Sequence, residues 1–263
     1  MSSTKPLEPT PSVRYEVDVA THVAVVEFVR EPTNSLDRQL LVDVLEAYHA
    51  VEEAGARAIV LCSAGRVFCS GADPHALSTM AFDDGSPHIY DAAVQLFDRP
   101  LPVVAAVQGP AIGAGLGLAL SADFRVAATT ARFSANFARL GLHQGFGISV
   151  TLPEVVGRQA ALDLLLSGRR IDGAAALATG LVDELVDPGR LRESAVARAS
   201  TLAECAPLAV RSIRSTMRGD LAARVRAAVA HEREEQARLQ ATEDFAEGTA
   251  AAIARRTPNF VGR

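Results

Sequence analysis

The chain is short of cysteine and has no tryptophan, and the cysteine count limits the class of protein. Its 263 residues include three cysteines, Cys62, Cys69 and Cys205, which lie among apolar neighbours. So few thiols cannot form the disulfide framework of a small secreted domain. A chain of this length also buries a core without cross-links. We therefore expect a globular protein of the reducing cytoplasm.

No apolar signal segment opens the chain either. Residues 1–12 are rich in proline and serine and predict a loose tail. One stretch, between Arg99 and Asp123, carries no charge and is long enough to cross a bilayer. Prolines, a glutamine and four glycines interrupt it, which is typical of a strand and a short helix buried in an α/β core. We expect no membrane insertion.

Neither sign of charge is in large excess. The formal net charge is -5, which excludes a general attraction to nucleic acid or acidic lipid. The arginines beyond residue 191 alternate with acids and have few aromatics between them, as on solvated helix faces. The expected partner is a small molecule or another protein.

Apolar periodicity predicts an opening hairpin, alternating helices and strands, and a long helical end. Strands are expected at 13–18, 22–30 and 57–63, with a strand-and-turn pattern over 124–137. Helices are expected at 36–54, 89–98, 191–205, 208–218, 221–240 and 243–256, with a helical stretch from about residue 152. This order indicates an α/β core over residues 13–200 and a helical region over residues 201–263.

The stretch VVAAVQGPAIGAGLGLAL, residues 103–120, has the order strand, glycine-rich turn and apolar helix. A second such unit, GRVFCSGADPHAL, covers residues 65–77, where Asp73 can cap the next helix, contact a ligand, or do both. Glycines allow close approach of the backbone, and helix N-termini carry partial positive charge. One N–H group from each unit can therefore stabilise negative charge that develops on a single ligand oxygen.

These segments resemble the crotonase superfamily, also called the enoyl-CoA hydratase/isomerase family. The resemblance rests on NSL, RAIVLCSAGRVFCSGAD, PLPVVAAVQGPAIGAGLGLALSADFRVA, FARLGL, LLLSGRRIDGAAALATGLVDELV and ARRTPNF, which follow one another along nearly the whole chain. It implies an α/β spiral of repeated ββα units and a C-terminal helical region that closes the pocket and builds a homotrimer or a dimer of trimers. It also implies an acyl-CoA thioester ligand, with coenzyme A as part of the ligand and no separate cofactor or metal.

The same resemblance implies the residues of the site. Ala72 in SGAD and Ala114 in GAG donate the two N–H groups of an oxyanion hole. Ser70, Ala72 and Asp73 lie beside the adenine and pantetheine of coenzyme A, and Arg66 lies near its phosphates. Arg66 can equally be an ordinary surface residue.

Two positions depart from the family pattern. The hydratases of this family use two glutamates, and alignment without a gap places Gly117 and Phe137 there. Neither side chain transfers a proton, so ordinary water addition is not expected. His75 and His143 are the acid/base candidates because imidazole titrates near neutral pH, although each can also be a hydrogen-bonded loop residue. Phe137 makes the pocket more apolar and favours a fatty-acyl group.

Two hypotheses about function follow from the resemblance. The chain is either an isomerase, hydrolase or lyase that uses the oxyanion hole, or a non-catalytic acyl-CoA carrier or sensor. A nucleotide-binding Rossmann domain is excluded because GAGLG is not GxGxxG and FRVAATT lacks the required acidic residue. Cys69 is expected to be a buried thiol without a catalytic role, given its apolar neighbours.

Overall fold

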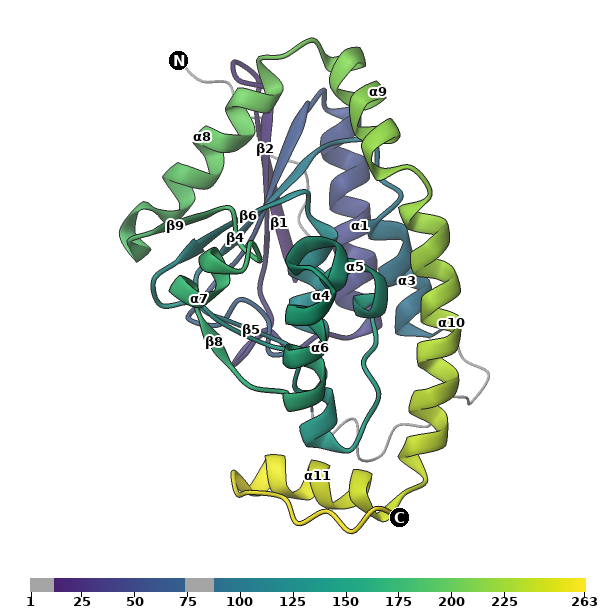
Figure 1. The fold of residues 1–263 in the computed structure, drawn as a ribbon. Helices are drawn as coiled ribbons and strands as arrows, with labels where there is room; N and C mark the ends of the chain where they lie inside the picture. Colours follow the sequence, from purple (N-terminus) through teal and green to yellow (C-terminus); the bar gives the residue numbers. More distant parts are fainter. Residues whose placement is uncertain (1–11, 74–87) are drawn as a thin grey trace.

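The computed structural model describes residues 12–73 and 88–263, and its centre is a six-stranded sheet (Figure 1). The strand order is β1-β2-β3-β4-β6-β9. The strands are β1 (Val13–Asp18), β2 (Val23–Phe28), β3 (Ala58–Ser63), β4 (Val103–Val107), β6 (Phe124–Ala128) and β9 (Glu184–Val186). β1 and β2 form the expected antiparallel hairpin, and the other neighbours pair in parallel.

Both faces of this sheet are buried. In β3, Ile59 and Leu61 face the side covered by α1 (Arg38–Glu53), whereas Ala58 and Val60 face α8 (Leu191–Ala203). Figure 1 shows α8 on one side of the sheet and α1 with α3 (Ile89–Leu96) on the other. A parallel strand between two helical layers must be apolar on both faces, which explains the uninterrupted run AIVLC.

A second, three-stranded sheet lies beside the first. It has the order β5-β7-β8 and consists of β5 (Pro110–Ile112), β7 (Arg132–Ser134) and β8 (Ile171–Asp172). The glycine-rich turn predicted between β4 and the next helix, α4 (Ala114–Ser121), therefore contains a short strand. The α/β fold class is confirmed, and this extra strand brings the start of α4 beside β7.

Helices make up most of the chain after β7. They are α5 (Ile148–Val156), α6 (Arg158–Ser167), α7 (Gly173–Ala178), α9 (Pro207–Arg218), α10 (Leu221–Gln240) and α11 (Glu243–Ala254). A short 3-10 helix, η1 (Asn136–Leu140), follows β7 and packs against α11. The long C-terminal helices are thus confirmed; α11 crosses the end of the molecule that lies lowest in Figure 1.

Asp123 fixes α9 to the sheet. Its Oδ2 accepts from the Val103 N–H at 2.8 Å and from Arg214 Nε at 3.0 Å, and its Oδ1 accepts from Arg218 Nε at 3.2 Å. A largely buried carboxylate needs such partners. Asp123 therefore joins the start of β6 to the C-terminal helical region.

Two predicted segments lie outside the described residues. One is most of the N-terminal tail, and the other begins after Asp73 and includes His75. In the part of the chain that the structure describes, no helix is both long and apolar enough to cross a membrane.

Candidate active site

Two amide side chains hold the shape of the loop after β3, residues 64–71. Asn34 is 4% exposed and donates from Nδ2 to the Val67 carbonyl oxygen at 2.7 Å. Gln108 donates from Nε2 to the same oxygen at 3.2 Å. Buried turn carbonyls need donors of this kind because they have no ladder partner. The NSL segment, which contains Asn34, therefore stabilises the conformation of this loop.

The end of the loop lies directly against the start of α4. Cys69 and Ala111 form a β-bridge, and the Ile112 N–H donates to the Cys69 carbonyl oxygen at 3.0 Å. Gly71 has a φ of +79°, and a Cβ there would lie 2.5 Å from the Ile112 oxygen and 3.3 Å from the Ala114 nitrogen. Only glycine allows this conformation and this approach.

Two backbone N–H groups at this junction, those of Ala72 and Ala114, donate to no acceptor within residues 12–73 and 88–263. Ala114 is the first residue of α4 and is 8% exposed, while Ala72 is half-buried. The first N–H groups of a helix lack intrahelical acceptors and carry partial positive charge. The junction can therefore offer donors to a ligand oxygen.

Apolar atoms surround positions 117 and 137. A Cβ on Gly117 would lie 2.6 Å from Phe146 Cδ1, so the ring of Phe146 already fills that space. Phe137 is 7% exposed, and its Cζ lies 3.8 Å from the Cβ position of Gly113, the residue before α4. Gly117 thus lies in α4 and Phe137 lies in η1 against the start of α4, and neither carries a group that transfers protons.

A buried series of hydrogen-bonded side chains, which the sequence analysis did not predict, lies next to Phe146. Tyr90 donates from its hydroxyl to Gln236 Oε1 at 2.9 Å, and Gln236 Nε2 donates to the His143 carbonyl oxygen at 2.9 Å. Burial, with a smaller effect of the charge on Glu232, raises the pKa of Tyr90, so the phenol stays neutral. This series joins α3, the loop before α5 and α10.

Glu232 of α10 is fully buried at the N-terminus of α5. Its Oε2 accepts from the Gly147 N–H at 2.8 Å and its Oε1 from the Ser149 N–H at 3.0 Å. A carboxylate at a helix N-terminus is favoured by both the free N–H groups and the helix dipole. Glu232 therefore fixes the loop that carries Phe146, which has a φ of +65°.

His143 faces α10. Its Nδ1 lies 2.8 Å from the Gln144 carbonyl oxygen, and its ring packs edge-on against His231 with 5.9 Å between centroids. These contacts turn the imidazole toward Gln144 and toward His231 of α10. His75 lies outside the described residues, and within the described ranges no three or more His, Cys, Asp or Glu side chains are grouped to hold a metal ion.

The residues assigned to coenzyme A lie on the outer side of the loop. Arg66 and Asp73 are exposed, and Ser70 is half-buried and donates from Oγ to Thr33 Oγ1 at 3.1 Å. Arg66 forms no ion pair with any described residue, so its guanidinium is open to solvent. These residues all lie within positions 66–73, on either side of Ala72.

Cys69 has the environment expected of a structural thiol. It is 0% exposed, and burial raises its pKa to about 12. The thiolate is the reactive form of cysteine, and the fold disfavours it here.

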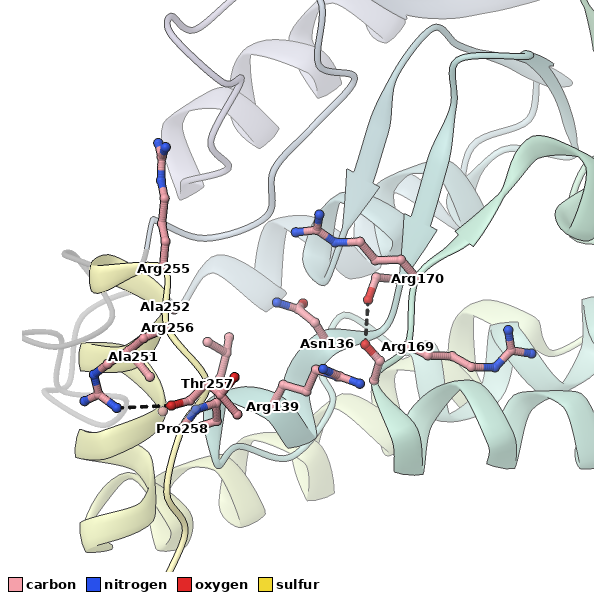
Figure 2. A pocket seen from close by; sticks show the side chains of 14 residues that line it. Asn136, Arg139, Arg169, Arg170, Ala251, Ala252, Arg255, Arg256, Thr257 and Pro258 are labelled. Carbon is pink, nitrogen blue, oxygen red and sulfur yellow. Dashed lines mark hydrogen bonds between the residues drawn. The ribbon is translucent and has the colours of Figure 1, made fainter.

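An open groove of about 940 Å³ lies on the other side of the α4 N-terminus, beyond Asn136 (Figure 2). All of its charged described lining residues are arginines: Arg139, Arg169, Arg170, Arg255 and Arg256. Sequence reasoning treated the C-terminal arginines as a solvated face and missed this groove. The local sequence signals for the groove are the arginine pairs in the segments GRRID and ARRTP, which lie far apart in the chain.

This combination of an α/β core, two glycine-controlled loops meeting at a helix start and a long helical end agrees with the crotonase type of fold. Residues 18–263 match the model of the enoyl-CoA hydratase/isomerase family, and the chain belongs to that family.

Relatives and solved structures cover nearly all of the chain. A probable enoyl-CoA hydratase from Rhodobacter capsulatus is 34% identical over 256 residues, which are 96% of this chain and 98% of the relative. The 2,3-dehydroadipyl-CoA hydratase of Escherichia coli is 34% identical over 235 residues, or 88% and 91% of the two chains. A crystal structure of an enoyl-CoA hydratase/isomerase from Pseudoalteromonas atlantica superposes with a TM-score of 0.84 at 31% identity, covering 95% of this chain and 100% of that one.

Proposed function

We propose that this chain binds acyl-CoA thioesters and places the thioester carbonyl oxygen at the N–H groups of Ala72 and Ala114. The observation that carries the proposal is the approach of Gly71 to the Ala114 nitrogen, which sets at one junction two N–H groups that have no acceptor among the described residues. Such donors stabilise an enolate or tetrahedral oxyanion, each worth on the order of 3 kcal/mol. The reaction would therefore depend on charge stabilisation at the carbonyl oxygen.

The coenzyme A part of the ligand would lie along the loop that leads to Ala72. Ser70, Ala72 and Asp73 would border the adenine and pantetheine. The guanidinium of Arg66, which pairs with no carboxylate in the described part of the chain, suits a phosphate. No cofactor other than the coenzyme A of the ligand is needed.

Water addition by a pair of carboxylates is not the proposed reaction. Gly117 and Phe137 carry no acid, and the Phe146 ring fills the space beside Gly117. The proposed class is an isomerisation, hydrolysis or carbon–carbon bond reaction that passes through a stabilised oxyanion. His75 and His143 remain the acid/base candidates, with His143 the weaker one because its ring contacts Gln144 and His231.

A non-catalytic acyl-CoA carrier or sensor is the second candidate function. The rings of Phe146 and Phe137 favour this function, because they fill the space beside the proposed thioester site with apolar atoms. No described side chain there can then transfer a proton to or from the ligand.

A panel of acyl-CoA thioesters separates these functions. Turnover of any saturated, unsaturated or branched thioester by the purified protein supports the enzyme, and tight binding without turnover supports the carrier. Rapid hydration of crotonyl-CoA would contradict the proposal that positions 117 and 137 have lost hydratase chemistry. Absence of binding to every thioester would overturn both candidates.

We also propose that α9 contributes to a homotrimer or a dimer of trimers. Leu208, Ile213 and Met217 are 81%, 63% and 80% exposed on this helix. Large apolar side chains that are exposed on one helix favour burial against another chain.

A further inference from the structure

The arginine groove, defined by Asn136 and the five arginines named above, has an unbalanced positive charge. None of its described lining residues is acidic. Arg169 pairs with Asp163 at 2.7 Å, and Arg256 pairs with Glu247. These two carboxylates therefore offset two of the five guanidinium groups.

The other three arginines have no carboxylate partner among the described residues. Arg139 donates from Nε to the Ser167 carbonyl oxygen at 2.9 Å, which leaves its charge uncompensated. Arg170 and Arg255 form no ion pair with any residue that the structure describes. An anion in the groove would be attracted by these uncompensated charges.

The groove reaches the candidate oxyanion site. Asn136 lines the groove, and its Oδ1 lies 3.2 Å from the Cβ position of Gly113, the residue directly before Ala114. Figure 2 shows Arg170 above Asn136, Arg139 below it, and the C-terminal end of α11 to its left. A ligand that bonds the Ala114 N–H can therefore extend past Asn136 into the arginines.

Strand order puts the groove on the side of the α4 N-terminus that is opposite the proposed coenzyme A path. Cys69 bridges to β5 on one side, whereas β7 and then β8 follow on the other. The proposed coenzyme A path ends at Ala72 on the Cys69 side, and the arginines lie beyond β7. The two sides are separated by the start of α4, where the carbonyl would be bound.

We propose that the arginine groove binds the carboxylate of an acyl group, so that the ligand is a thioester of a dicarboxylic acid. The inference rests on the proposed acyl-CoA function, because it needs the carbonyl at Ala114. Arginine binds carboxylates in a bidentate manner and stays charged at all physiological pH values. Phe137 is not among the described lining residues, so it does not make the far end of this ligand site apolar.

Affinity for matched thioesters tests the groove. Dissociation constants of succinyl-, glutaryl- and adipyl-CoA are compared at low salt with those of butyryl-, pentanoyl- and hexanoyl-CoA, and with that of coenzyme A alone. The same ligands are titrated into the double variant Arg170→Gln/Arg255→Gln. The control is Arg38→Gln/Arg226→Gln, which removes two exposed arginines that lie outside the groove lining and form no ion pair with described residues.

At least one dicarboxylic thioester should bind tenfold or more tightly than its neutral match. The groove variant should lose most of that preference and keep the affinity for the neutral thioester, and the control variant should keep both. An equal loss for neutral thioesters and free coenzyme A would overturn the proposal, because the arginines would then bind coenzyme A phosphates. Absence of any preference for a carboxylate would overturn it as well.

Binding of free adipate distinguishes a failure of this proposal from a failure of the proposed acyl-CoA function. If no thioester binds, but adipate binds to the wild type and tenfold more weakly to the groove variant, the anion site stands without an acyl-CoA role. If thioesters bind without regard to a carboxylate, the acyl-CoA function stands and the anion site does not.

Discussion

The ring of Phe146 occupies the space that a side chain on Gly117 would need. A Cβ on Gly117 would lie 2.6 Å from Phe146 Cδ1, 2.7 Å from Cγ and 2.8 Å from Cβ. Phe146 is 0% exposed and is held in a left-handed conformation by a loop that Glu232 fixes. A glutamate at position 117 would therefore displace a packed ring, which agrees with the proposal that this position has no carboxylate role.

Replacement of Gly117 by alanine should destabilise the protein. The added methyl group overlaps a buried ring with little room to move, which costs about 1 to 3 kcal/mol. Chemical denaturation measures the loss, and the double variant Gly117→Ala/Phe146→Leu should behave non-additively because the shorter side chain relieves the overlap. Wild-type stability of Gly117→Ala would show that the ring is not fixed there.

Glu232→Ala should lower the free energy of unfolding by about 2 to 4 kcal/mol, because two buried N–H groups at the start of α5 lose their acceptor. Glu232→Gln should lose less, since one amide oxygen remains. Glu234→Ala is the matched control, because Glu234 is exposed on the same helix. Equal stability of the Glu232→Ala and Glu234→Ala variants would contradict the role of Glu232.

Only one of the three thiols should react in the folded protein. Cys205 is exposed, whereas burial raises the pKa values of Cys62 and Cys69 to about 12. Titration with a disulfide reagent at about pH 8 should detect one thiol per folded chain and three in denaturant. Cys205→Ser should remove the fast reaction, and a fast reaction that persists would place a reactive thiol in the core.

An acidic substitution on α9 should dissociate the proposed assembly. Leu208→Asp/Met217→Asp places two charges on exposed apolar positions, so light scattering should show a smaller particle with an unchanged circular dichroism spectrum. Val19→Asp is the control, because Val19 is 56% exposed in the hairpin turn. A wild-type monomer would refute the proposed assembly.

Local sequence signals were enough to predict the hairpin, the strand after α1 and the C-terminal helices. Each of these elements has a clear apolar period, and α1 also has an N-cap in Asp37 and ends beside Gly55. The short strands β5 and β8 could not be predicted in this way. They have three and two residues, and they exist because β7 lies between them.

The site was only partly predictable for the same reason. The two glycine loops are continuous in sequence and were recognised, and the structure places Gly71 against Ala114. The arginine groove is built from three segments, around residues 139, 169 and 255, which only the tertiary fold brings together. The fit of Phe146 against Gly117 is likewise a contact between distant positions, and no local pattern reports it.

The polarisation of the thioester carbonyl tests the central claim most directly. Hexanoyl-CoA labelled with ¹³C at the carbonyl is bound to the protein, and the carbonyl stretch is followed by difference infrared spectroscopy. Ala114→Pro removes one N–H at a helix position that tolerates proline, and Ala114→Gly keeps the N–H as the control.

Binding to the wild type and to Ala114→Gly should move the band to lower frequency, and Ala114→Pro should lose most of that movement. Any turnover found in the thioester panel should fall by about 10² to 10³ in Ala114→Pro. A bound thioester whose carbonyl band matches that in water, or is equally shifted in Ala114→Pro, would contradict the account.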